Sequence, residues 1–188
     1  MKKVPENALK AILFLAALLL SGGAFAQEEA EEIFLDFPAS WAGHWAGRLE
    51  IFAPDGKVQD LPMELHILDV DSAYTWTIVY GQGETADRRE YLLRPAKPKF
   101  GLYKIDELNS IVLDATYIAG KLYSRFEVGN ALLLSTTELV GDELHYEIIS
   151  GENKPRSITG GVEHEGEMMP EVKSLPVVMR HIAVLRKR

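Results

Sequence analysis

Cysteine is absent from the 188 residues of the chain. The protein therefore forms no disulfides, performs no thiol catalysis and carries no lipid on a cysteine. The sequence also lacks a nucleophile elbow, a phosphate loop and a nucleotide fingerprint, and the glycine pair Gly81 and Gly83 is typical of a hairpin loop. We predict no catalytic residue. Whether the protein is an enzyme stays open, with a non-catalytic role favoured.

Long apolar runs are also scarce, and the clearest one covers residues 11–20. It is about half as long as the roughly 20 residues that a membrane-spanning helix needs. Lys2, Lys3 and Lys10 precede it, and the small-residue site Ala24-Phe25-Ala26 follows it. This order is typical of a secretory signal peptide that is cleaved before Gln27. We therefore expect an exported protein, periplasmic or secreted, that is not inserted in a membrane after cleavage.

Basic residues are fewer than acidic residues in this chain. Loss of residues 1–26 removes three lysines and one glutamate, which takes the formal net charge from -8 to -10 over the remaining 162 residues. Nucleic acids and anionic membranes repel such a chain, so we predict no nucleic-acid partner. Residues 27–37 are expected to form an acidic tail, and residues 38–188 are the right length for a single domain. The oligomeric state stays open.

Helical periodicity is weak, and short runs of alternating apolar and polar residues dominate from Trp45 onward. The first run places Trp45, Gly47, Leu49 and Ile51 on one face. Turn residues separate it from further runs at residues 61–67, 74–80, 87–94, 100–106, 111–118, 121–128, 131–140, 143–150 and 177–186. Residues 95–98 contain two prolines and are expected to end a strand. Residues 151–175 are expected to form a long loop.

This regular spacing predicts an all-β fold, an up-and-down antiparallel β-barrel of about 8–10 strands. Pairing of the last strand with the first would remove both sheet edges. The alternative is an open sandwich of two sheets, which needs long crossover connections. Only one long connection is present, so the barrel is favoured.

Gly43-His44-Trp45 at the start of the first strand, together with a basic residue in the last strand, resembles the calycin superfamily of lipocalins and fatty-acid-binding proteins. The resemblance implies a lipocalin-like barrel in which Trp45 closes one end. It also implies a short turn at Gly43 and a cation, from Arg186 or Arg180, that packs on the indole.

The pattern Trp41-x-Gly-x-Trp-x-Gly47 is similar to the start of the ten-stranded haem-binding barrels called nitrobindins. That resemblance implies a histidine near the end of the chain as the iron ligand, and His181 lies in a comparable region. The alternative function is therefore a haem-dependent or small-molecule-dependent enzyme that uses the barrel interior. No other cofactor is predicted.

Aromatic side chains on the inward strand faces are the candidate ligand-binding residues. They would give an interior of apolar rings with hydroxyl tips, which suits a small hydrophobic or amphipathic molecule. The alternative is that these rings only fill the core. The candidates are Trp45, Tyr74, Trp76, Tyr80, Tyr91, Tyr103 and Tyr117.

Metal-type side chains are dense only at Glu163-His164-Glu165 and Glu167. They lie in a glycine-rich acidic segment without a second histidine at helical spacing, so we predict a solvated loop and no metal site. A third functional alternative is a scaffold or interaction protein of the cell envelope that docks a partner through residues 151–175.

Overall fold

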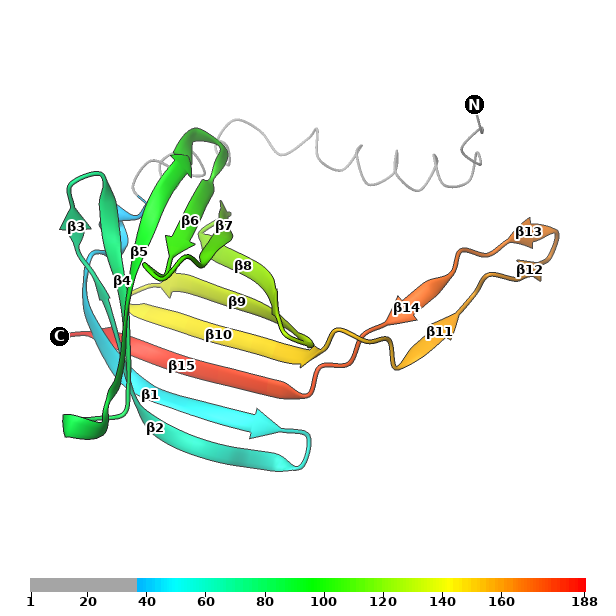
Figure 1. The fold of residues 1–188 in the computed structure, drawn as a ribbon, viewed down its shortest axis with the longest axis horizontal. Helices are drawn as coiled ribbons and strands as arrows, with labels where there is room; N and C mark the ends of the chain where they lie inside the picture. Colours follow the sequence, from blue (N-terminus) through cyan, green and yellow to red (C-terminus); the bar gives the residue numbers. More distant parts are fainter. Residues whose placement is uncertain (1–36) are drawn as a thin grey trace. The chain divides into compact units, whose positions relative to one another are not determined.

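The computed structural model describes residues 37–188 (Figure 1). The predicted signal peptide and all but the last residue of the predicted acidic tail therefore lie outside the described residues. A single 3-10 turn, η1 (Ala39–Trp41), leads into the first strand. The long strands are β1 (Gly43–Ala53), β2 (Gly56–Ile67), β4 (Ala73–Tyr80), β5 (Asp87–Lys97), β6 (Leu102–Asp106), β7 (Val112–Ile118), β8 (Lys121–Val128), β9 (Ala131–Val140), β10 (Glu143–Glu152) and β15 (Met179–Lys187).

These ten strands close into an antiparallel up-and-down barrel, as the sequence predicted. Neighbours in the wall are neighbours in the chain, and β15 closes the ring by pairing with both β10 and β1. The pairing of β2 with β4 completes the wall, and the two-residue strand β3 (Asp69–Val70) extends its edge beside β4. The sandwich alternative is excluded, because a single continuous sheet forms the barrel.

Alternation along each strand divides the residues between a packed interior and a polar exterior. Six core side chains are each 0% exposed, namely Met63, Leu65, Ile67, Leu93, Leu144 and Leu185. They come from β2, β5, β10 and β15 and meet near the end where β1 begins. Apolar burial at this end stabilises the barrel.

The two tryptophans of the opening pattern close this end of the barrel. The Nε1–H of Trp45 donates to the backbone oxygen of Trp41 at 2.8 Å, and both side chains are buried. The ring of Trp41 meets that of Tyr117 edge-on, with centroids 6.0 Å apart and planes at 74°. A cation also covers the indole of Trp45: the Nζ of Lys187 lies 5.3 Å from its centroid.

The identity of that cation corrects the prediction of Arg186 or Arg180. In the β1–β15 register Trp45 pairs with Lys187, whereas Ala46 pairs with Arg186. Because a shift of one residue reverses the face, Arg186 points outward and pairs with Glu143 at 2.8 Å. Arg180 likewise pairs with Glu147 outside, at 2.5 Å. A Cβ at Gly43 would overlap the Lys187 side chain, so the predicted glycine leaves room for this contact.

Two segments differ from the predicted pattern. Strand β5 continues through Pro95 to Lys97, because a register shift between Pro95 and Lys97 accommodates the proline that we expected to end the strand. A short 3-10 turn, η3 (Pro98–Phe100), then leads to β6. The second segment, residues 151–175, is not an irregular loop.

Residues 153–178, called the ribbon below, leave the barrel as a narrow β-hairpin between β10 and β15 (Figure 1). In it β11 (Ser157–Thr159) pairs with β14 (Val172–Ser174), and β12 (Glu163–His164) pairs with β13 (Glu167–Met168). The predicted acidic cluster lies at its exposed tip. Among residues 37–188, no three His, Cys, Asp or Glu side chains form a group that could hold a metal ion. No helix in this part of the chain is long and apolar enough to cross a membrane.

Candidate functional site

The barrel interior contains a cavity of about 510 Å³ at the end opposite the Trp45 closure. Six strands, β4 and β6 to β10, each supply an apolar side chain to it. These are Ile78, Ile105, Leu113, Phe126, Leu133 and Ile148. Because successive side chains of a strand alternate between its two faces, these six side chains all point inward. The small residues Ser124, Ala131 and Ser135 lie between them and leave the cavity unfilled. The hollow is therefore predominantly apolar.

A pair of hydroxyl groups lies in this apolar interior. The hydroxyls of Tyr80 and Tyr146 are 3.2 Å apart and form a hydrogen bond. Strands β4 and β10 are separated in the wall by β15, β1 and β2, so the contact between the two tyrosines spans the interior rather than one strand pair. Burial raises the pKa of Tyr146 well above its ordinary value, and that of Tyr80 to a smaller degree.

Arg89 lies at the mouth of the cavity, over the ring of Tyr80 at 5.0 Å from the centroid. Its Nε and Nη2 both donate to Oδ2 of Asp87, at 3.0 and 2.8 Å. This bond raises the pKa of Arg89 above its ordinary value. The side chain of Tyr91, on the same face of β5, also reaches the cavity, and its pKa is raised by burial and by the negative charge of Glu107.

Glu107 belongs to the tight connection between β6 and β7. The backbone there is held in unusual conformations, with positive φ at Leu108 (59°) and Ser110 (82°). Local hydrogen bonds fix it: the Asp106 carboxylate accepts from the Leu108 N–H at 2.9 Å, and the Asn109 side-chain oxygen accepts from the Ile111 N–H at 3.0 Å. Both Glu107 and Ile111 line the cavity, so this stiff turn forms part of its rim.

Three of the seven predicted ligand-binding residues line the cavity, namely Trp76, Tyr80 and Tyr91. Trp45, Tyr103 and Tyr117 instead lie in the packed end, each 3% exposed. Tyr74 precedes Trp76 on the same face of β4 but is also outside the cavity wall. Alternation along the strands could not separate the cavity-lining aromatic residues from those in the packed end. Inward-facing residues recur at every second position at both ends of a barrel.

Sequence reasoning missed Arg89, Glu107 and Tyr146 as cavity residues. Arg89 lies on the same face of β5 as Tyr91 and Leu93. This pattern could have predicted that its side chain faces the barrel interior. The pattern of Asp106 and Asn109 around Glu107 is typical of a fixed turn, and it is the local signal that could have placed Glu107 at the rim. No local signal marks Tyr146 as a residue whose partner comes from β4.

His181, the predicted iron ligand, faces inward between Ile51 and Ile148 in the β15 register. It is half-buried, and burial lowers its pKa below the ordinary value. It does not line the cavity, and none of the described cavity-lining residues is a histidine or a methionine. His181 thus lies beside the cavity-lining residue Ile148 but outside the described lining, and we assign no chemistry to a haem here.

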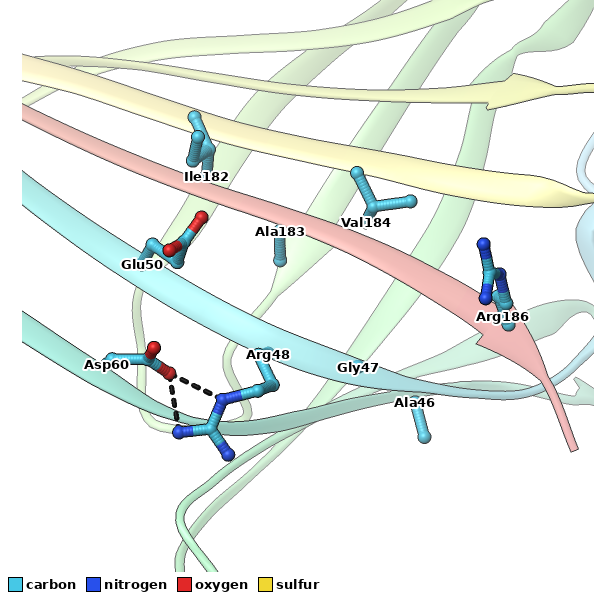
Figure 2. A pocket seen from close by; sticks show the side chains of 9 residues that line it. All are labelled: Ala46, Gly47, Arg48, Glu50, Asp60, Ile182, Ala183, Val184 and Arg186. Atoms are coloured by element: carbon cyan, nitrogen blue, oxygen red, sulfur yellow. Dashed lines mark hydrogen bonds and ion pairs between the residues drawn. The ribbon is translucent and has the colours of Figure 1, made fainter.

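A second hollow lies on the outer surface of β1, β2 and β15 (Figure 2). Its floor consists of Ala46, Gly47 and the apolar side chains of β15. Its charged groups are already paired, because Arg48 binds Asp60 at 2.5 Å and Arg186 binds Glu143. A Cβ at Gly47 would overlap the backbone oxygen of Val184, so the glycine is required for the close approach of β1 and β15. This hollow is a concave, solvent-exposed part of the outer surface, and the interior cavity is the better candidate ligand-binding site.

No protein-family model matches the chain, and no curated protein matches it in sequence. Solved structures do match it in fold. An S-type phycobiliprotein lyase, CpeS, from Guillardia theta has a TM-score of 0.56 and 10% sequence identity, over 88% of this chain and 98% of that one. A DUF3598-family protein of unknown function from Nostoc punctiforme has a TM-score of 0.53 and 13% identity.

The match to the Nostoc punctiforme protein covers 82% of this chain but 49% of that one, so the present chain spans about half its length. Rv2717c from M. tuberculosis has a TM-score of 0.45 and 15% identity, over 82% of this chain and 97% of that one. The first two similarities are consistent with the closed barrel described above. They establish the fold alone.

The buried tyrosine gives a testable pH dependence. An acid whose pKa is raised in the folded state contributes stability below its unfolded pKa of about 10, and this contribution is lost as the pH rises above that value. We expect the free energy of unfolding to fall as the pH rises above about 10, and to fall less in Tyr146→Phe. Urea unfolding at several pH values measures this. An equal fall in the variant would contradict a special role for burial of Tyr146.

Proposed function

We propose that the barrel binds one small amphipathic molecule in its interior cavity and performs no reaction on it. The apolar body would contact the Ile, Leu and Phe side chains of the wall, and the polar end would lie at the mouth beside Tyr80, Arg89 and Tyr91. The observation that carries the proposal is a hollow of about 510 Å³ in a barrel whose other end is filled by buried side chains. A hollow of this size suits a small ligand.

Two further features support binding. Barrels of eight to ten strands are wide enough to enclose one small ligand among their side chains. The hydroxyl pair of Tyr80 and Tyr146 offers hydrogen bonds inside an otherwise apolar space, which would orient a polar group. Similarity in fold to a phycobiliprotein lyase is compatible with a small-molecule ligand.

The test has two parts. Protein purified from its native host is extracted with organic solvent, and the extract is analysed by mass spectrometry for a stoichiometric small molecule. Ligand-stripped protein is then titrated with a neutral solvatochromic dye such as Nile red. We expect saturable binding at one dye per chain with a blue-shifted emission. Absence of both a co-purified molecule and saturable dye binding would contradict the proposal.

Three earlier expectations stay predictions. Haem binding through His181 is tested by haem titration at the Soret band with the wild type and His181→Ala. Export is tested by N-terminal sequencing of the protein from its host, which should begin at Gln27. Docking of a partner through residues 151–175 is tested by deletion of that segment, after which partner binding should be lost while the barrel remains folded.

A further inference from the structure

The charges at the mouth of the cavity do not cancel. Asp87, Arg89 and Glu107 lie at this end, and Arg89 directs two of its N–H groups at Asp87. Asp87 and Arg89 therefore form a neutral pair, with Nη2 and Oδ2 2.8 Å apart. The remaining formal charge among the three groups is the negative charge of Glu107.

The carboxylate of Glu107 has a neutral partner. The Nδ2 of Asn109 donates to its Oε2 at 3.3 Å, and within residues 37–188 no Lys, Arg or His lies within ion-pair distance of it. Glu107 and Tyr91 both line the cavity, and burial together with the charge of Glu107 raises the pKa of Tyr91. An anion without a counter-ion beside an apolar cavity attracts a cation more strongly than the same anion in bulk water.

The position of this charge is fixed by the backbone. The N–H of Glu107 donates to the Ile111 oxygen at 3.0 Å, which closes the turn that Asp106 and Asn109 stabilise from inside. Glu107 and Ile111 thus stand together on the rim, one charged and one apolar. A ligand that fills the cavity must bring its polar end near this carboxylate.

We propose that Glu107 makes the cavity selective for amphipathic molecules whose polar end carries a positive charge, such as a primary amine on a hydrocarbon chain. This inference rests on the proposed function, since it names the ligand class of the same cavity. A cationic end would complete the ion pair that Glu107 lacks. A carboxylate end would meet a negative charge, while the guanidinium that could receive it is held by Asp87.

The test compares three ligands with one chain length. Decylamine, decanol and decanoate compete with the neutral dye on ligand-stripped full-length protein, for the wild type, Glu107→Gln and Glu84→Gln. Glu84 lies in η2 (Gly83–Thr85), is exposed and is outside the cavity wall, so its variant removes the same charge near the same end of the barrel. We expect the wild type to bind decylamine about tenfold more tightly than decanoate, with decanol between them.

Glu107→Gln should reduce this ratio to less than about threefold, and Glu84→Gln should leave it unchanged. Equal affinities in the wild type, tighter binding of decanoate, or equal effects of the two variants would overturn the inference. If dye binding is saturable in these cases, the proposed function still stands. If the dye and all three ligands fail to bind, the proposed function itself fails.

If Glu107→Gln does not fold, the salt dependence of ligand binding by the wild type tests the inference. The preference for decylamine over decanoate should shrink by severalfold between about 20 mM and 500 mM salt, because salt screens a charge at the rim. A preference that does not change with salt would overturn the inference.

Discussion

Trp45→Ala is expected to lower the free energy of unfolding by about 3–5 kcal/mol. The side chain is 3% exposed, its N–H is bonded to the Trp41 oxygen, and Lys187 covers its ring. Removal of the indole leaves a cavity at the closed end and takes the partner from a buried carbonyl group. Urea unfolding followed by circular dichroism measures the loss, and it should appear as a lower midpoint with an unchanged slope.

Trp45→Phe separates the two contributions. It retains an aromatic ring but removes the N–H donor, so we expect a loss of about 1–3 kcal/mol, clearly less than for alanine. A matched substitution at the other end, Phe126→Ala, tests whether position matters. Phe126 borders the cavity, so its removal should cost less than removal of Trp45. A loss below about 1 kcal/mol for Trp45→Ala would contradict closure by this residue.

Ala131→Trp is expected to weaken binding of the neutral dye by at least about tenfold. Ala131 lines the cavity at the start of β9, where a small side chain leaves the interior accessible. An indole at this position would occupy part of the space of about 510 Å³ and narrow the mouth. Dye titration of the folded variant measures the change in dissociation constant.

Leu132→Trp is the matched control, because neighbouring residues of a strand point to opposite faces. Leu132 lies on the outer side of the barrel near the root of the ribbon, beside Ile149 and Pro176. The same indole there should leave dye affinity unchanged. Equal weakening by both substitutions, or no weakening by Ala131→Trp, would show that the dye does not occupy the interior.

The barrel could be predicted because each strand carries its own evidence. Alternation over seven to ten residues, interrupted by turn residues, indicates both the strand and its inward face. The pairing of β15 with β1 followed from the need to remove the sheet edges, and the structure confirms it. Trp76, Tyr80 and Tyr91 were placed inside for the same reason.

The details that depend on exact register could not be predicted. Lys187 and Arg186 are adjacent basic residues, and only the pairing of Trp45 with Lys187 decides which one covers the indole. The role of Glu107 depends on a turn that brings it onto the cavity rim, and the contact of Tyr80 with Tyr146 depends on closure of the barrel. These are properties of the assembled wall rather than of a local segment.

The root of the ribbon is the junction between the ribbon and the barrel, and the sequences of these two parts can change independently. The Val178 N–H donates to the Ser150 oxygen at 2.8 Å, so the two legs of the ribbon start side by side. At Gly151 the legs pass so closely that a Cβ would overlap the Pro176 oxygen. A segment whose ends meet in this way can be shortened, lengthened or replaced without a change in the strands that flank it. This junction is therefore a natural insertion point, at which new sequence can be added while the cavity keeps its walls.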